Sequence, residues 1–451
     1  MKADNRRASV GTERRYRPIA AGIAGQLLLL VVAAGLTAAP ARAELPQYAA
    51  PVHEGVATCA SSVCHGSATE RSGTNVLQNE FVTWTRYDKH AGAYSLLLND
   101  DSKRIARKLG LPNAHEAGIC LDCHADNVPV EQRGEEFQIS DGVGCEACHG
   151  GSENWLASHT ADGATHGDNL AAGLYPTEDI AARAELCLSC HLGTGAKFAT
   201  HEIMGAGHPR LSFELSTFSA LQPPHWAFDA DYARRKGAQD EFDTWTRGVL
   251  ASARESLGLL QGSLMHDSGL FPEIALFDCH SCHHPMSEIR WATTATTAGL
   301  EPGVVRINDA NLVILLPIAE GIAPALHGRM LQQVRTLNAS VTRGRAALQS
   351  AAKALEGSVG ELEQAVADGS SDAVARRKVL DGVLARAARG DYRDYVAAEQ
   401  ATMAMDTLLI SLNQWDANKT RMDALFATVE NDEAFRPARF AAAADSLRKG
   451  L

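Results

Sequence analysis

No cysteine precedes Cys59 and none follows Cys282, although the chain of 451 residues contains 10 of them. Chemistry that needs a thiol is therefore excluded from the C-terminal part of the sequence. An excess of basic residues is also lacking, because 54 acidic side chains outnumber 42 basic ones and the net charge is −12. This balance argues against a nucleic-acid ligand. Long apolar runs are absent after residue 43, which argues against a multi-pass membrane protein.

The first 43 residues have the pattern of a secretory signal. A basic start is followed by an apolar stretch centred on residues 27–32, and Ala-Arg-Ala at 41–43 supplies a small-x-small cleavage site. The mature chain is therefore predicted to begin at Glu44 and to reside in the periplasm. The Arg-Arg pair at 6–7 lacks the residues that follow it in a twin-arginine signal, which favours a Sec-type route. The apolar stretch is also long enough for the alternative, an uncleaved membrane anchor.

Cleavage would make the protein strongly acidic. Residues 1–43 carry seven basic and two acidic side chains, so that their removal lowers the net charge from −12 to −17. Such a charge predicts partner proteins with a basic docking face and no nucleic acid. Simple solubility is the alternative explanation. Membrane association is expected only if the signal stays uncleaved.

The cysteines that are present come in pairs, and a histidine follows the second member of every pair. Four pairs have the spacing C-x-x-C-H, and the first pair has four intervening residues instead of two. The paired cysteines are Cys59 and Cys64, Cys120 and Cys123, Cys145 and Cys148, Cys187 and Cys190, and Cys279 and Cys282. The histidines that follow them are His65, His124, His149, His191 and His283. We number these motifs 1 to 5 in chain order.

This spacing has a physical cause. Residues three apart lie on one face of a helical turn, so both thiols can reach the two vinyl groups of one porphyrin. The next residue then aims its imidazole at the iron as the proximal ligand. The wider first motif must bulge to do the same. The sequence therefore predicts five covalently attached c-type haems.

Other uses of paired cysteines explain the pattern less well. Disulfides are permitted in the periplasm, and an even number of cysteines suits them, but they do not require a histidine after every second cysteine. Zinc sites with paired C-x-x-C leave the next residue free as well. Thioredoxin-like redox motifs come singly. Five motifs that use every cysteine in the chain indicate haem attachment.

The haems are also expected to be structural. Four attachment sites fall between Cys59 and His191, which leaves too few residues per site for an ordinary apolar core. Porphyrin faces would supply that core, with loops and short helices around them. Glycines are frequent in residues 142–167, where small residues let the backbone approach a flat macrocycle. The expected fold class is mainly α, with little regular structure around packed haems.

Second axial ligands must come from the 12 remaining histidines of the chain's 17. His90 lies between the first two motifs, and His159 follows the third. His201 and His208 bracket a glycine-containing segment after the fourth motif. These four histidines are the distal candidates. His327 lies far from any cysteine, and His280 and His284 are too close to motif 5 to reach their own iron.

These residues resemble the cytochrome c-554 family, whose type member is the tetrahaem electron carrier of ammonia oxidation. The resemblance covers roughly residues 59–191. It rests on a tryptophan followed by His-Ala, on the third and fourth motifs with their flanking residues, and on one histidine between them. In this sequence these are Trp84, His90-Ala91, Gly142-Val143-Gly144-Cys145-Glu146-Ala147-Cys148-His149-Gly150, His159 and Cys187-Leu188-Ser189-Cys190-His191.

The resemblance implies particular axial partners. His90 would bind the iron of the third haem, and His159 that of the fourth. In the family the second haem lacks a distal ligand from the protein, and His115 stands near enough to motif 2 in this sequence to leave the point open. The widened first motif, the fifth motif and the long C-terminal region depart from the family. The physiological partner is therefore not carried over.

The C-terminal region reads as a helical bundle. Residues 300–451 contain no cysteine, one histidine, and many Ala, Leu, Arg and Glu residues. Helices are expected at 231–266 and near 310–350, 372–389, 392–413 and 434–449. The predicted organisation is a signal at 1–43, a pentahaem domain at 44–299 and a helical domain at 300–451. The last domain would be a docking or dimerisation module, or a cap over the haems.

Two function classes follow from this interpretation. Haems with two histidine ligands are coordinatively full, so they would relay electrons without binding a substrate. The alternative is an oxidoreductase in which an open haem acts on a small nitrogen or sulfur compound. Pentahaem nitrite reductases typically use a Cys-x-x-Cys-Lys haem, and the sequence contains no such motif. An electron-transfer relay is the favoured hypothesis.

Overall fold

The computed structural model describes residues 43–451, except 239, 266–271, 285–291 and 370. The predicted signal therefore lies outside the described residues, apart from Ala43. Helices dominate the described chain, where the only bridges outside strands join His53 to Arg133 and Phe277 to Ile307. The mainly-α prediction is confirmed. No described helix is long and apolar enough to cross a membrane.

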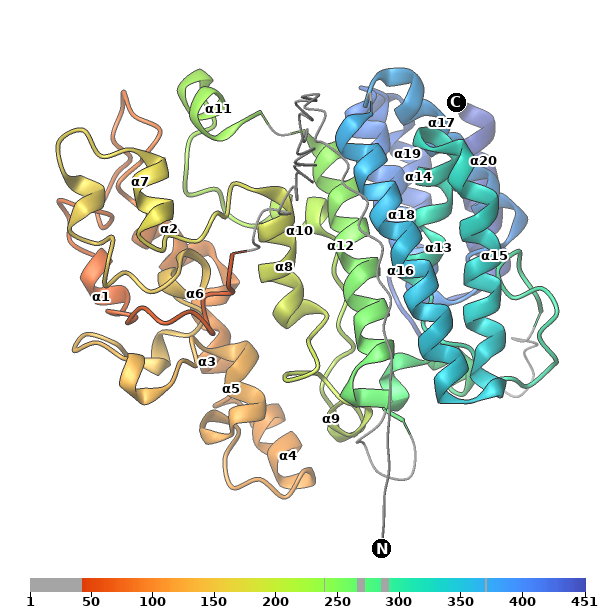
Figure 1. Ribbon diagram of the computed structural model, residues 1–451, viewed down its shortest axis with the longest axis horizontal. Helices are drawn as coiled ribbons and strands as arrows, with labels where there is room; N and C mark the ends of the chain where they lie inside the picture. The colour runs from red at the N-terminus through yellow and green to blue at the C-terminus, as the bar shows by residue number, and fades with distance from the viewer. Residues whose placement is uncertain (1–42, 239, 266–271, 285–291, 370) are drawn as a thin grey trace, which may run out of the picture. The chain divides into compact units, whose positions relative to one another are not determined.

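Short helices joined by loops form the part of the chain that carries motifs 1 to 4 (Figure 1). Their buried apolar clusters are small; one consists of Leu97, Ala106, Ala114, Leu121 and Ala125. This region therefore has little apolar core of its own, in keeping with its predicted dependence on a large cofactor. The helices are α1 Val56–Cys59, α2 Glu80–Tyr87, α3 Ala93–Leu96, α4 Asp100–Lys108, α5 Gly118–His124, α6 Cys145–His149, α7 His166–Ala171, α8 Ile180–His191, α9 His201–Ala206, α10 Leu215–Leu221 and α11 Ala230–Lys236.

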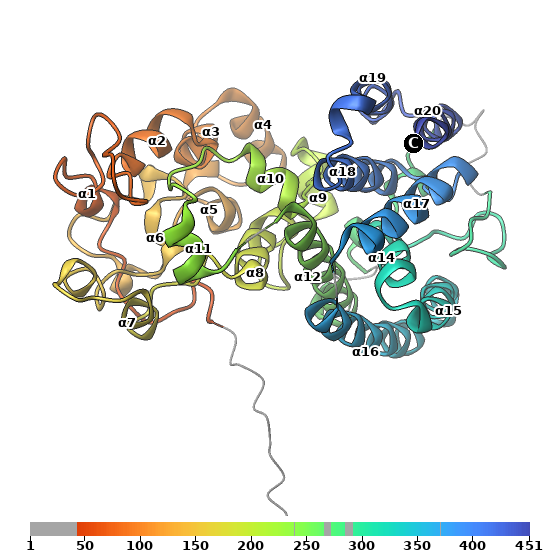
Figure 2. The ribbon, with the colours of Figure 1, turned by 90° about the horizontal axis from the view of Figure 1, so that it is seen from above.

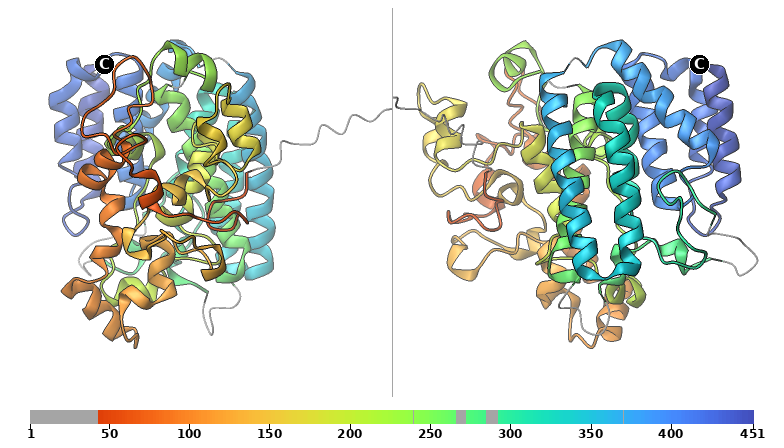
Figure 3. Two further views of the ribbon diagram at one scale, coloured as in Figure 1. Left: turned by 90° about the vertical axis from the view of Figure 1, so that its left-hand side faces the viewer. Right: turned by 45° about the vertical axis from the view of Figure 1, so that its right-hand side comes forward.

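Longer helices form a bundle around one extended core that runs from Phe242 to Leu447. Several of them are seen nearly end on in Figure 2, and α15 and α16 lie side by side in Figure 3. Apolar residues at helical spacing face this core, as amphipathic helices require. The helices are α12 Glu241–Gln261, α13 Ala310–Val313, α14 Leu315–Ile322, α15 Pro324–Ser340, α16 Arg345–Asp368, α17 Ala373–Arg389, α18 Tyr395–Ser411, α19 Trp415–Phe426 and α20 Pro437–Gly450.

The single helix expected near 310–350 is wrong. Three helices, α13 to α15, occupy this stretch, and α16 starts after Gly344. α15 begins at Pro324, which has no N–H to continue the preceding helix and suits a first helical position. Gly344 has a φ of 90°, a conformation that side chains with a Cβ rarely adopt. Gly237, with a φ of 87°, likewise separates α11 from α12 inside the segment expected to be one helix.

The boundary predicted between residues 299 and 300 does not mark the start of the bundle. Trp245 and Leu257 on α12 are fully buried in the same core as Leu408 on α18. α12 also packs against α8 and α10, so one helix contacts both regions. Residues Ala43–Leu451 accordingly form one compact unit. The cysteine content changes near residue 282, but the apolar face that builds the bundle begins earlier, in α12.

Candidate functional site

In motifs 2, 3 and 4 one helix carries both cysteines. Motif 2 lies on α5, motif 3 forms α6, and motif 4 ends α8. In motif 5 a 3-10 turn, Cys279–Ser281, carries the first cysteine. Residues three apart on a helical turn share one face, so these helices suit attachment of both thiols to one porphyrin, with the histidine next in the chain.

In the widened first motif the two additional residues form a turn between the cysteines. The His65 N–H donates to the carbonyl of Cys59 at 3.2 Å, and in motif 5 the His283 N–H donates to the carbonyl of Cys279 at 2.7 Å. Between the cysteines of motif 1, the Cys64 N–H closes a turn on the carbonyl of Ser61 at 2.9 Å. In motif 1, as in motif 5, the backbone N–H of the histidine therefore bonds to the carbonyl of the first cysteine, although motif 1 contains two additional residues.

Each motif histidine lies opposite a second histidine from elsewhere in the chain. The ring centroids of the five pairs are 6.1–6.3 Å apart. The rings of His65 and His159 are nearly parallel, at 12°, and three other pairs are close to perpendicular. In motif order, the pairs are His65 with His159, His124 with His208, His149 with His225, His191 with His90, and His283 with His201.

This separation fits two imidazoles on opposite sides of one metal ion. With roughly 2 Å between the metal and each ligating nitrogen, the centroids would lie about 6 Å apart. A ring pair in direct stacking contact would lie closer. Each pair would supply the two imidazole ligands that a haem iron can take from a protein. The residues present therefore fit a haem at each pair.

The second ring nitrogen of several paired histidines is already engaged. Nδ1 of His124 lies 3.0 Å from the carbonyl of Ala93, and Nδ1 of His159 lies 2.6 Å from that of Leu156. Nδ1 of His208 lies 2.7 Å from the carbonyl of Pro209. A histidine that binds a metal commonly donates its other N–H in this way, which fixes the ring and leaves Nε2 for the metal.

Burial keeps other members of the pairs neutral. It lowers the pKa of His149 to about 3, and it also lowers the pKa values of His191, His208 and His225. An uncharged imidazole is the form that binds a metal. The electrostatics of these four side chains therefore suit ligation.

The structure pairs the predicted distal histidines differently from the resemblance. His90 lies opposite His191 of motif 4, not the histidine of motif 3, and His159 lies opposite His65 of motif 1, not that of motif 4. Both implied assignments are thus corrected. The chain folds back between motifs, so that order along the sequence does not give order in space.

The remaining two candidates acquire partners that sequence reasoning did not name. His208 lies opposite His124, so motif 2 has an imidazole partner. His115 does not take this place: its ring lies edge-on to Tyr94, and its Nε2 lies 3.8 Å from Glu116. His201 lies opposite His283.

Sequence reasoning missed His225, the partner of His149. This residue follows Pro223 and Pro224, and its ring lies edge-on to Trp226 at 5.0 Å. The two prolines restrict the backbone before His225 and so fix its position. This signal could have made His225 a stronger candidate for a distal ligand. A distal ligand has no fixed distance from its motif along the chain, so no spacing rule could have identified it.

All ten cysteines lie in the described residues, and none forms a disulfide. Thiols from different motifs nevertheless meet. The Cys145 thiol of motif 3 lowers the pKa of the Cys59 thiol in motif 1, and the Cys123 thiol of motif 2 lowers the pKa of the Cys190 thiol in motif 4. Burial is the main cause that raises the pKa of the Cys148 thiol, and the thiols of Cys187 and Cys190 in motif 4 raise it further. The attachment sites therefore neighbour one another in the order 1, 3, 4, 2.

A cavity of about 610 Å³ opens beside motif 1. Ala57 and Ala60 line it from the side of the motif, and Trp84 and Ala91 line it from α2 and the segment after it. The volume lies in the range of cofactor sites, and small side chains leave room for a flat ring. Trp84, one of the residues behind the family resemblance, is fixed there by a hydrogen bond from Nε1 to the carbonyl of Val143 at 3.2 Å.

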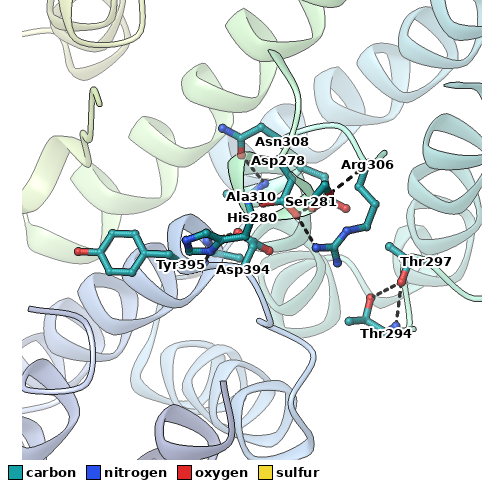
Figure 4. A network of polar contacts seen from close by, with 12 residues as sticks. Asp278, His280, Ser281, Thr294, Thr297, Arg306, Asn308, Ala310, Asp394 and Tyr395 are labelled. Atoms are coloured by element: carbon teal, nitrogen blue, oxygen red, sulfur yellow. Dashed lines mark hydrogen bonds and ion pairs between the residues drawn. The ribbon is translucent and has the colours of Figure 1, made fainter. Parts of the chain in front are cut away.

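The bundle holds motif 5 through a buried polar network (Figure 4). Asp278, just before the motif, forms an ion pair with Arg306 and accepts the N–H of His280 at 3.0 Å. His280 in turn accepts the N–H of Tyr395 at the start of α18 at 3.3 Å, and its Nε2 lies 2.7 Å from Asp432. His280 is thus an anchoring residue between motif 5 and the bundle.

Helix α18 also fixes the loop that carries His208. Glu399 forms an ion pair with Arg210 at 3.1 Å and accepts the hydroxyl of Ser212 at 2.7 Å. The side chain of Gln400 donates to the carbonyl of Phe213 at 2.8 Å. One helix of the bundle therefore contacts both motif 5 and the residues next to the partner of motif 2.

We expect the stability of this region to depend on pH through Asp309. Burial raises its pKa to about 7, while the side chain of Asn338 donates to it at 2.8 Å. The folded state then holds a proton that the unfolded state releases above pH 3.8. The contribution of Asp309 to the free energy of unfolding is therefore full below pH 3.8 and declines up to about pH 7, by about 4 kcal/mol.

Asp309→Asn removes this decline. In urea titrations between pH 4 and 8, the free energy of unfolding of the variant relative to that of the wild type should rise with pH, by up to about 4 kcal/mol. Asp416→Asn changes an exposed aspartate of the same bundle and serves as control. Parallel pH profiles for wild type and Asp309→Asn would show that the prediction is wrong.

Comparison with known proteins finds one similarity, in the N-terminal part of the described chain. Residues 58–150 match the family model described as cytochrome c554 and c-prime, a stretch that contains motifs 1, 2 and 3. No curated protein matches the chain, and no solved structure does.

Proposed function

Because residues 58–150 match the model of the cytochrome c554 and c-prime family, we propose that the chain is a c-type cytochrome that acts as a pentahaem electron-transfer relay. The observation that carries the proposal is the set of five histidine pairs, each of which joins one motif histidine to a second imidazole 6.1–6.3 Å away. The haems would supply one-electron redox chemistry, and the chain supplies their attachment and axial ligands.

Full axial ligation favours a relay over an enzyme. An iron that binds two imidazoles has no position for a substrate. The second motif is the decisive one, because the family resemblance implies an open iron there. His208 opposite His124 argues for closure at this site, and therefore against an oxidoreductase that acts on a small nitrogen or sulfur compound.

Contacts between the motifs support transfer from site to site. The cysteine sulfurs of motif 1 lie beside those of motif 3, and the sulfurs of motif 2 lie beside those of motif 4. The partners of motifs 2 and 5, His208 and His201, lie at the two ends of the short segment 201–208, which contains α9. We therefore infer that the sites are arranged in the sequence 1, 3, 4, 2, 5.

The setting of this relay is the periplasm in our proposal. A secretory signal and covalent haem attachment both suit that compartment. The acidic chain, with a net charge of −17 after cleavage, would attract redox partners that present a basic face. The bundle would act as a scaffold for motif 5, as the contacts of His280 with Asp432 and Tyr395 suggest.

Mass spectrometry and stopped-flow spectroscopy of the purified protein test this proposal. We expect a polypeptide that starts at Glu44 and carries five covalent haems, all low-spin. The reduced protein should exchange electrons with other cytochromes and should not turn over nitrite, nitric oxide, hydroxylamine, sulfite or tetrathionate.

A bare polypeptide mass would contradict haem attachment, and a four-haem mass would point to failure of the widened Cys59–Cys64 site. Sustained turnover of any of the five compounds would favour the oxidoreductase instead of the relay.

A further inference from the structure

The paired histidines differ in what their Nδ1 atoms contact. Nδ1 of His65 lies 2.9 Å from the Glu80 carboxylate, and Nδ1 of His90 lies 2.8 Å from the Asp88 carboxylate. His124, His159 and His208 instead contact backbone carbonyl oxygens. The sites of motif 1 and motif 4 therefore have an anionic partner behind one imidazole, whereas that of motif 2 has neutral ones behind both.

Both carboxylates belong to the two ends of one helix. Glu80 is the first residue of α2, and Asp88 is the residue that ends it. Their side chains are only 15% and 6% exposed. α2 thus presents one buried carboxylate to a ligand of motif 1 and the other to a ligand of motif 4.

Further hydrogen bonds orient these two groups. Glu80 also accepts the N–H of Gln78 at 3.0 Å. Asp88 accepts the N–H of His90 at 2.9 Å and the side-chain amide of Gln222 at 3.2 Å. These hydrogen bonds therefore fix the orientation of both carboxylates toward the imidazoles.

The charge behind a ligand changes the preference of a metal for its oxidation states. A carboxylate that accepts the N–H of a coordinated imidazole makes the other nitrogen a stronger donor, which stabilises the more highly charged metal. A backbone carbonyl is neutral, and hydrogen bonds to it are weaker than charge-assisted ones. The oxidised state should therefore be favoured most where a buried carboxylate stands behind the ligand.

We propose that Glu80 and Asp88 are positioning residues that lower the reduction potentials of the haems held by His65 and His90. The inference rests on the proposed haem ligation and adds an order of potentials to it. Motif 3 neighbours both motif 1 and motif 4. Two low-potential sites would then flank the site of His149, so that potentials alternate along this end of the relay and α2 sets the alternation.

Spectroelectrochemical titration of the five-haem protein tests the proposal in Glu80→Gln and Asp88→Asn. Each change keeps a hydrogen-bonding side chain of nearly equal size and removes the charge. We expect one of the five one-electron transitions to move to higher potential in each variant. At a fixed applied potential, the ratio of reduced to oxidised haem at that site should rise about tenfold, which corresponds to about 59 mV for one electron. The double variant should move two transitions.

Glu178→Gln is the matched control. Glu178 contacts Nε2 of His166 at 2.6 Å, but His166 belongs to none of the five pairs. This variant should leave all five transitions in place. A shift as large as that of Glu80→Gln would mean that the titration reports any loss of charge, and it would overturn the proposal.

Haem content and spin state distinguish this inference from the proposed function. Five low-spin haems with unchanged potentials in Glu80→Gln and Asp88→Asn would overturn the inference and leave the relay intact. Conversion of one haem to high spin would show that the carboxylates only hold the rings, which overturns it as well. A wild-type protein without haem would instead refute the proposed function itself.

Discussion

Replacing His208 by alanine will convert one of the five proposed haem sites from low spin to high spin and open it to carbon monoxide. The ring of His208 lies 6.3 Å from that of His124, and its Nδ1 is fixed by the carbonyl of Pro209. Alanine offers no ligand, so the iron of motif 2 would lose its sixth position while both cysteines still hold the haem. Binding of carbon monoxide should rise from almost none to about one per protein.

Electron paramagnetic resonance and the carbon monoxide difference spectrum of the reduced protein measure this change. His115→Ala is the control, because His115 is near motif 2 in sequence but lies against Tyr94 and Glu116. It should leave all haems low-spin. If His115→Ala opened the site and His208→Ala did not, the pairing would be wrong. High-spin haem in the wild type would revive the oxidoreductase hypothesis.

Replacing Phe435 by alanine will destabilise the bundle by about 3–5 kcal/mol, as loss of a buried aromatic side chain does. Phe435 is completely buried, its ring lies parallel to that of His280 at a centroid distance of 6.2 Å and an angle of 7°, and it lies edge-on to Tyr395 at 5.6 Å. The cavity would open beside the histidine that anchors motif 5. We therefore expect the free energy of unfolding to fall and the spectrum of the fifth haem alone to change.

Urea titration followed by circular dichroism measures the loss of stability. Phe426→Ala is a matched control, because Phe426 ends α19 with 39% of its surface exposed. It should cost about 1 kcal/mol or less. Equal effects of the two substitutions would mean that Phe435 has no special part in the core. Loss of stability with an unchanged fifth haem would separate the bundle from motif 5.

The five Cys–His motifs are recognisable in the sequence because the attachment chemistry proposed for them is local. Two thiols and a proximal imidazole that are to meet one porphyrin must lie within a few residues of each other. The distal partners were not predictable in the same way. His225 approaches His149 only because the chain returns after motif 4, and no spacing links the two residues. His90 and His159 face the histidines of motifs 4 and 1, whereas the resemblance implies motifs 3 and 4.

Helix prediction in the bundle shows a similar division. The helices α17 and α20 lie close to the residues expected from apolar periodicity, because that periodicity reports one buried face per helix. The breaks at Pro324 and Gly344 were overlooked, although both residues interrupt a helix by their own backbone chemistry. That α12 belongs to the bundle became clear only from the structure, in which its apolar face packs into the same core as the C-terminal helices.

The sequence by itself determined the chemistry of this protein: five pairs of cysteines, each followed by a histidine, within a mainly helical chain. Only the tertiary structure decided how the sites are completed and connected. It brought His208 to motif 2 and His225 to motif 3, joined the thiols of motifs 1 and 3, and put the carboxylates of α2 behind two imidazoles. The reason is that attachment depends on neighbours along the chain. Axial pairing, contact between sites and the charge around each ligand depend on residues that only folding brings together.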